Sequence, residues 1–111
     1  MSQFVQVATT TADREEAVRL ARSIVKARLA ASAQIIGPVT SVFWHLGELG
    51  EGTEWQLYLK TTTDRYADLA AHLRQEHSWE NPEITATELM LGSEDYFEWL
   101  TRTVESADDS G

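Results

Sequence analysis

The sequence predicts an α+β domain in which strands and helices follow in the order β-α-β-β-α-β, with one further helix at the C-terminal end. Four stretches are rich in Val, Ile, Phe, Trp and Thr, and three others carry apolar residues at helical spacing. The chain has 111 residues, 42% of them hydrophobic and none of them cysteine. We therefore expect residues 1–111 to form a single domain with one core and no disulfide.

The first two elements are a strand over residues 4–10 and a helix over residues 12–29. The strand is a short run of Phe, Val and Thr, and its final threonines suit the entry to a helix. In the helix, apolar residues recur every three or four positions, and Asp13 and Glu16 place carboxylates in the first turn.

A long β-rich stretch over residues 32–49 is interrupted by Gly37-Pro38. Proline cannot donate to a sheet, so this dipeptide predicts a bulge or an edge position, in one bent strand or in two strands in series. The glycine-rich segment 47–52 is expected to turn the chain into an alternating strand over residues 54–62, which completes a hairpin.

A second, more polar helix is expected from Thr63-Asp64 to about His77, followed by a strand over residues 84–91. Ser93 is expected to cap the last helix, which carries Tyr96, Phe97, Trp99 and Leu100, with Tyr96 and Trp99 as packing residues. Residues 105–111 read as a frayed tail. The whole order is the ferredoxin-like pattern, whose second sheet face must be solvated, covered by the extra helix or buried against another subunit. Four tryptophans in so small a chain favour a partner.

The net charge of the chain, its N-terminal sequence and the motifs it lacks argue against several classes of function. A formal net charge of −9 repels phosphate backbones, so we expect no nucleic-acid partner, although the charge can also serve solubility alone. No segment predicts a membrane span or a signal peptide, so the expected location is the cytoplasm. The chain lacks a phosphate-binding loop, the common zinc and serine hydrolase motifs, and any cysteine nucleophile, which argues against an enzyme.

The segment 77–83 is the best candidate for a functional site. His77, Glu80 and Glu83 lie within seven residues beside Pro82, and imidazole with carboxylates suits Zn, Cu(II) or Ni. The alternative is that His77 caps the second helix and the glutamates are solvated or ion-paired.

Three weaker candidates lie elsewhere in the chain. His45 is a possible but less favoured metal ligand in the long strand. His72 and Glu76 have the i, i+4 spacing of a helical chelate, which is more often a solvated face. Lys60 either binds an anion or, as we favour, pairs with an acidic side chain.

Five segments, taken together, resemble the CutA family of divalent-cation-tolerance proteins over almost the whole chain. They are RLAASAQI at 28–35, VTSVFW at 39–44, LYLKT at 57–61, HSWENPEI at 77–84 and YFEWL at 96–100. The resemblance implies a ferredoxin-like subunit in a homotrimer similar to that of the PII signalling proteins. It also implies a link to copper and other divalent metals, and no established catalytic activity.

The same resemblance implies a pocket between subunits, with no obligatory cofactor and with Cu or Zn as possible ligands. By motif position, the pocket residues would be Trp44, Lys60, His77, Trp79, Glu80 and Glu83, with His77, Glu80 and Glu83 as metal ligands. Four positions depart from the family pattern. Ser32 stands in place of the usual cysteine, which excludes a soft Cu(I) site built on that thiol. Gly37-Pro38 reverses the usual Pro-Gly, and His45 replaces a tryptophan. The motif at 77–83 is also altered.

Three functions follow in order of preference. The first is a non-enzymatic, trimeric, metal-responsive protein that uses His77, Glu80 and perhaps Glu83. The second is a PII-like regulatory module that binds a small anionic or zwitterionic metabolite through Lys60 and also binds a partner protein. The third, least favoured, is an enzyme with His77 and Glu80 as an acid–base pair.

Overall fold

In the computed structural model, which describes residues 3–105, the predicted α+β class and order of elements are confirmed. The elements are β1 (Phe4–Thr11), α1 (Arg14–Lys26), β2 (Ser32–His45), β3 (Glu48–Thr62), the 3-10 turn η1 (Thr63–Arg65), α2 (Tyr66–Glu76), β4 (Thr85–Glu88) and α3 (Glu94–Thr103). Residues 106–111 of the predicted tail lie outside the described part of the chain.

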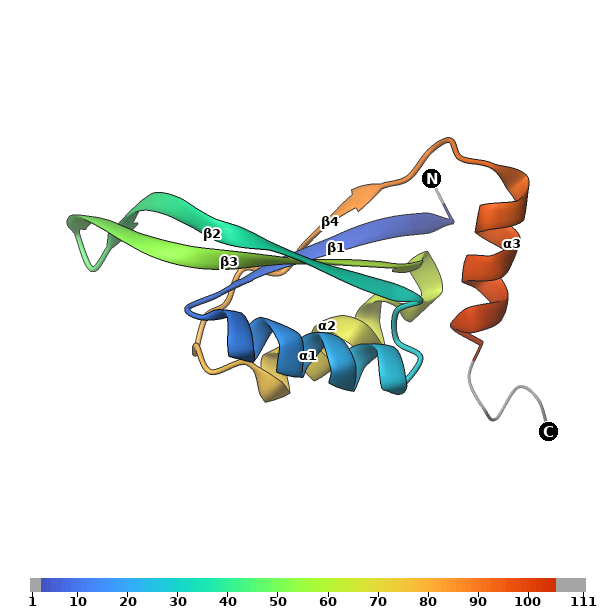
Figure 1. Cartoon of the computed structure of the whole chain (residues 1–111), viewed down its shortest axis with the longest axis horizontal. Helices are drawn as coiled ribbons and strands as arrows, with labels where there is room; N and C mark the ends of the chain where they lie inside the picture. Colours follow the sequence, from blue (N-terminus) through green and yellow to red (C-terminus); the bar gives the residue numbers. More distant parts are fainter. Residues whose placement is uncertain (1–2, 106–111) are drawn as a thin grey trace.

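The four strands form one antiparallel sheet in the order β2-β3-β1-β4, and α1 and α2 cover one of its faces (Figure 1). Between sheet and helices lies the main core, which contains Val7, Leu57, Leu59, Leu20, Ile24, Leu69 and Leu73, all fully buried. Because strand side chains alternate between faces, Gln6 and Lys60 lie on the other face. α3 covers one end of the molecule, where Leu100 and Val104 pack with Ala31 and Phe4.

The bulge and the edge position predicted at Gly37-Pro38 are both confirmed. β2 is one long strand whose register against β3 shifts between Ile36 and Val39, and the Gly37–Pro38 peptide bond is cis. The shift moves the side chains beyond it to the opposite face, so Trp44 lies beside Leu49 instead of Glu48. The far half of the β2–β3 hairpin projects beyond the helices, in a molecule 49 Å long and 28 Å wide (Figure 1).

The predicted turn over residues 47–52 is wrong. The turn is only Leu46-Gly47, both with positive φ (52° and 80°), and His45 faces Glu48 across the hairpin. β3 therefore begins six residues earlier than predicted. Gly50 lies within it, opposite Phe43, whose ring lies 2.7 Å from the position that a Cβ at Gly50 would occupy. Gly50 therefore makes room for the Phe43 side chain instead of turning the chain.

Two other elements, α1 and β4, end earlier than predicted. α1 ends at Lys26 because Arg28 adopts a positive φ of 61°, while the N–H of Leu29 bonds the carbonyl oxygen of Ile24 in a Schellman-type cap. β4 ends at Glu88, which leaves Met90 and Leu91 exposed.

The cap predicted at Ser93 is confirmed, since its hydroxyl accepts the Tyr96 N–H at 3.3 Å. In α3, Leu100 is buried and Phe97 stacks on Phe4. The packing role predicted for Tyr96 and Trp99 is wrong for the core of this chain, since both are exposed and contact each other.

Candidate functional site

His77 ends α2 and begins the connection to β4. Its backbone N–H bonds the carbonyl oxygen of Leu73 at 2.9 Å, so the residue occupies the C-cap position of the helix. Its side chain does not cap α2. The ring instead turns toward β1 and is fully buried.

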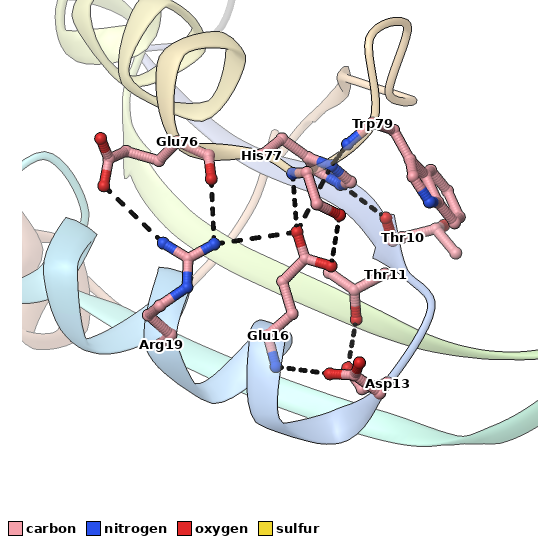
Figure 2. A network of polar contacts seen from close by, with 9 residues as sticks. Thr10, Thr11, Asp13, Glu16, Arg19, Glu76, His77 and Trp79 are labelled. Carbon is pink, nitrogen blue, oxygen red and sulfur yellow. Dashed lines mark hydrogen bonds and ion pairs between the residues drawn. The ribbon is translucent and has the colours of Figure 1, made fainter.

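Both ring nitrogens of His77 are hydrogen-bonded within the chain (Figure 2). Nε2 lies 2.8 Å from the main-chain oxygen of Thr10, which can only accept, so Nε2 carries the proton. Nδ1 accepts the Trp79 N–H at 3.0 Å. The imidazole is thus neutral in this arrangement, and neither nitrogen offers a free lone pair to a metal ion.

Glu16, near the start of α1, binds the residue that follows His77. Its carboxylate accepts the N–H and the hydroxyl of Ser78 at 2.8 and 2.9 Å, and it lies 3.8 Å from the Arg19 guanidinium. Asp13 caps the helix by accepting the N–H of Glu16 at 2.8 Å. Asp13 and Glu16 were expected only as helix-entry carboxylates, and no signal in the sequence linked Glu16 to Ser78.

Trp79 is half-buried, and its ring lies against that of His77, with the centroids 5.3 Å apart and the planes tilted by 40°. The backbone of residues 77–79 is therefore held by α1, by β1 and by the imidazole itself.

The two glutamates of the candidate segment have different surroundings. Glu83 accepts hydroxyl hydrogen bonds from Thr10 at 3.2 Å and Thr85 at 3.1 Å, at the edge of the sheet. Glu80 is exposed and lines a groove beside α2. In the described range 3–105, no group of three His, Asp or Glu side chains is placed to hold a metal ion. One chain thus does not bring His77, Glu80 and Glu83 together around a common point.

The remaining predicted pocket residues lie apart from this segment in a single chain. Lys60 donates to the Gln34 side-chain oxygen at 3.2 Å, so its partner is an amide instead of the favoured carboxylate. Lys60 lies opposite Gln6 on β1, whereas His77 contacts Thr10 on the same strand. Gln6 and Thr10 are four residues apart, which is about 13 Å along the strand. Trp44 is 75% exposed on the projecting hairpin.

The other candidate histidines take part in different contacts. His45 is exposed at the hairpin tip, opposite Glu48. His72 does not chelate together with Glu76: its Nε2 lies 2.7 Å from the Ser23 hydroxyl of α1, while Glu76 lies 3.7 Å from Arg19. These contacts join α1 to α2.

Comparison with known proteins gives one consistent family. The profile described as CutA1 divalent ion tolerance protein matches residues 5–103. The divalent-cation tolerance protein CutA of Archaeoglobus fulgidus is 30% identical over 95% of this chain and 100% of its own length. Its counterpart from Pectobacterium atrosepticum is 31% identical over 90% of this chain and 91% of its own.

Solved structures agree with the sequence relatives. CutA1 from Oryza sativa superposes with a TM-score of 0.90 at 30% identity, covering 94% of this chain and 95% of that one. A structure described as the periplasmic divalent cation tolerance protein CutA from Archaeoglobus fulgidus gives 0.89 at 29% identity, covering 92% and 99%. The cytoplasmic location expected for this chain thus stays a prediction. None of the helices in residues 3–105 has the length and apolar character needed to cross a membrane.

Proposed function

Because the chain belongs to the CutA1 family of divalent ion tolerance proteins, we propose that it acts as a non-enzymatic homotrimer that responds to divalent cations. The proposed cation site lies between subunits and uses residues of the segment 77–83. The expected ligands are nitrogen and oxygen donors, because the chain has no cysteine.

The observation that supports assembly most directly is the exposed apolar surface of the β2–β3 hairpin. Trp44, Leu46 and Leu49 are 75%, 89% and 66% exposed at its end, beyond the cover of the helices (Figure 1). Large exposed apolar groups that lie together are typical of interaction surfaces. β2 is also an edge strand without a charged residue from Ser32 to Trp44, whereas isolated edge strands usually carry charges that prevent pairing.

Assembly would also supply what the single chain lacks at the proposed cation site. Glu80 has no hydrogen bond or ion pair with the described residues, and Glu83 is bonded only to hydroxyl groups. Both carboxylates are exposed and can accept a cation together with ligands from a neighbouring copy. His77 would join them only by exchanging its bond to the Trp79 N–H. Its structural role is to hold the segment in place.

The alternative of a PII-like regulatory module is less favoured. It assigns ligand binding to Lys60, which is bonded to Gln34, and the related proteins are described as divalent-cation tolerance proteins.

Sedimentation velocity tests the assembly. We expect wild type at three times the 12.5 kDa chain mass and Trp44→Glu at lower mass. Thr101→Glu adds the same charge at an exposed position of α3 and serves as the control. A monomeric wild type would contradict the proposal.

Calorimetry with Cu(II) and Zn(II) tests the cation site. Glu80→Gln and Glu83→Gln should reduce the heat of binding relative to wild type, and His77→Gln should change it if the ring joins the ligand set. Equal heats from wild type and all three variants would exclude this site.

A further inference from the structure

A groove of about 630 Å³ runs between the outer face of α2 and residues 80–84. Ala67, Ala71 and Arg74 line it from the helix at i, i+4 and i+7, which places them on one face. Glu80 and Ile84 line it from the connection to β4. The groove lies beside the segment 77–83, but it does not include His77.

The two walls of the groove carry side chains of opposite charge, and neither side chain is paired with another residue in the described part of the chain. Neither Arg74 nor Glu80 forms a hydrogen bond or an ion pair with any residue in the range 3–105, and they do not pair with each other within 4.0 Å. By contrast, Arg19 in the neighbouring helix contacts both Glu16 and Glu76. A bound molecule with both charges would meet both walls.

The segment that forms the wall at residues 80–84 is held by contacts of Ser78, Trp79 and Glu83, none of which lines the groove. Ser78 is bonded to Glu16, the Trp79 N–H to His77, and Glu83 to Thr10 (Figure 2 shows the contact between Trp79 and His77). The other wall is a helix whose inner face is buried in the core through Leu69 and Leu73. The groove therefore exists before a ligand arrives, which lowers the entropic cost of binding.

We propose that this groove binds a small zwitterion, an amino acid or a dipeptide. The Arg74 guanidinium would receive the carboxylate in a two-pronged hydrogen bond, and Glu80 would accept the ammonium group. The apolar body of the ligand would lie over Ala67, Ala71 and Ile84. The volume falls in the range of small-molecule sites.

The balance of charge selects this class of ligand. A purely anionic molecule would be repelled by a chain of net charge −9, and a purely cationic one would meet Arg74 in the same groove. A zwitterion has no net charge and satisfies both side chains. The groove shares Glu80 with the proposed cation site, but the inference does not depend on a cation response, because Arg74 takes no part in that site.

Two-dimensional ¹H–¹⁵N NMR of the full chain in EDTA tests the proposal, with L-alanine and L-alanyl-L-alanine as separate probes. Binding should shift the amide signals of Ala71, Arg74 and Asn81, and the tighter probe identifies the size of the ligand. N-acetyl-alanyl-alanine lacks the ammonium group and alanyl-alanine amide lacks the carboxylate, so each should bind at least about tenfold more weakly.

Arg74→Gln and Glu80→Gln should each weaken binding by a similar factor and leave the urea midpoint unchanged, because both side chains are exposed. Arg22→Gln removes an exposed arginine of α1 and is the matched control. Absence of shifts with both probes, or shifts that survive Arg74→Gln, would overturn the proposal. Arg74→Gln should leave the heat of metal binding unchanged, and Glu83→Gln should leave zwitterion binding unchanged. The two variants therefore distinguish a failure of the cation-site proposal from a failure of the zwitterion proposal.

Discussion

The Nε2–H of His77 donates to the main-chain oxygen of Thr10 over 2.8 Å, and so joins the end of α2 to β1 across 67 positions of sequence. We expect His77→Ala to lower the free energy of unfolding by about 2 kcal/mol, because the Thr10 oxygen and the Trp79 N–H both lose a buried partner. Urea denaturation measures the loss. His45→Ala, at the exposed hairpin tip, should change stability by less than about 0.5 kcal/mol. Similar effects of the two substitutions would contradict the structural role.

The protonation of the His77 ring follows from the same two bonds. In metal-free protein we expect a neutral imidazole with the proton on Nε2 and a lone pair on Nδ1. Long-range ¹H–¹⁵N NMR of the ring distinguishes the two nitrogens, and exposed His45 provides the reference for a solvated ring. A proton on Nδ1 would mean that the Trp79 N–H bonds elsewhere.

Glu16 should stabilise the start of the candidate segment more than its neighbour Glu15 does. Glu16→Ala removes the acceptor for both the N–H and the hydroxyl of Ser78, with an expected loss of about 1–2 kcal/mol. The Ser78 amide should then exchange faster with deuterium. Glu15 lies in the same helical turn but is exposed, so Glu15→Ala controls for the helix dipole. Unchanged exchange at Ser78 in Glu16→Ala would show that other contacts hold the segment.

Local patterns predicted the element order, because the strand runs, the first helix and the Ser93 cap depend on neighbouring residues. The bend at Gly37-Pro38 was predictable because the missing proline N–H interrupts any ladder. The end of α1 was not predictable, because it depends on a positive φ at Arg28 and an arginine in the sequence does not indicate that conformation. The turn was misplaced because glycine serves two purposes here. At Gly47 it permits a positive φ, whereas at Gly50 it makes room for Phe43.

The candidate site was only partly predictable for a related reason. Sequence proximity indicated that residues 77–83 matter, and the structure places this segment in a dense polar network. Proximity does not determine direction, however. His77 turns into the protein, Glu83 bonds the Thr10 and Thr85 hydroxyls, and Glu80 lines the groove beside α2. Glu16 was missed as a partner because its contact with Ser78 spans 62 positions.

The hairpin tip offers a stabilising substitution. Leu46 has a φ of 52°, a conformation that costs a non-glycine residue about 1 kcal/mol, and its side chain is 89% exposed. Asparagine tolerates this conformation and precedes glycine in the favoured two-residue hairpin turn. Leu46→Asn should therefore raise the free energy of unfolding by about 0.5–1 kcal/mol, measured by urea denaturation at fixed protein concentration.

Leu49→Asn is the control for that substitution, because it makes the same change at an exposed position of β3 and should not stabilise. If Leu46→Asn instead destabilises the protein and lowers its sedimenting mass, the leucine is retained for a contact between copies. The strain at Leu46 would then be offset by apolar burial in the assembly, and Leu46 would contribute to the proposed assembly surface as directly as Trp44 does.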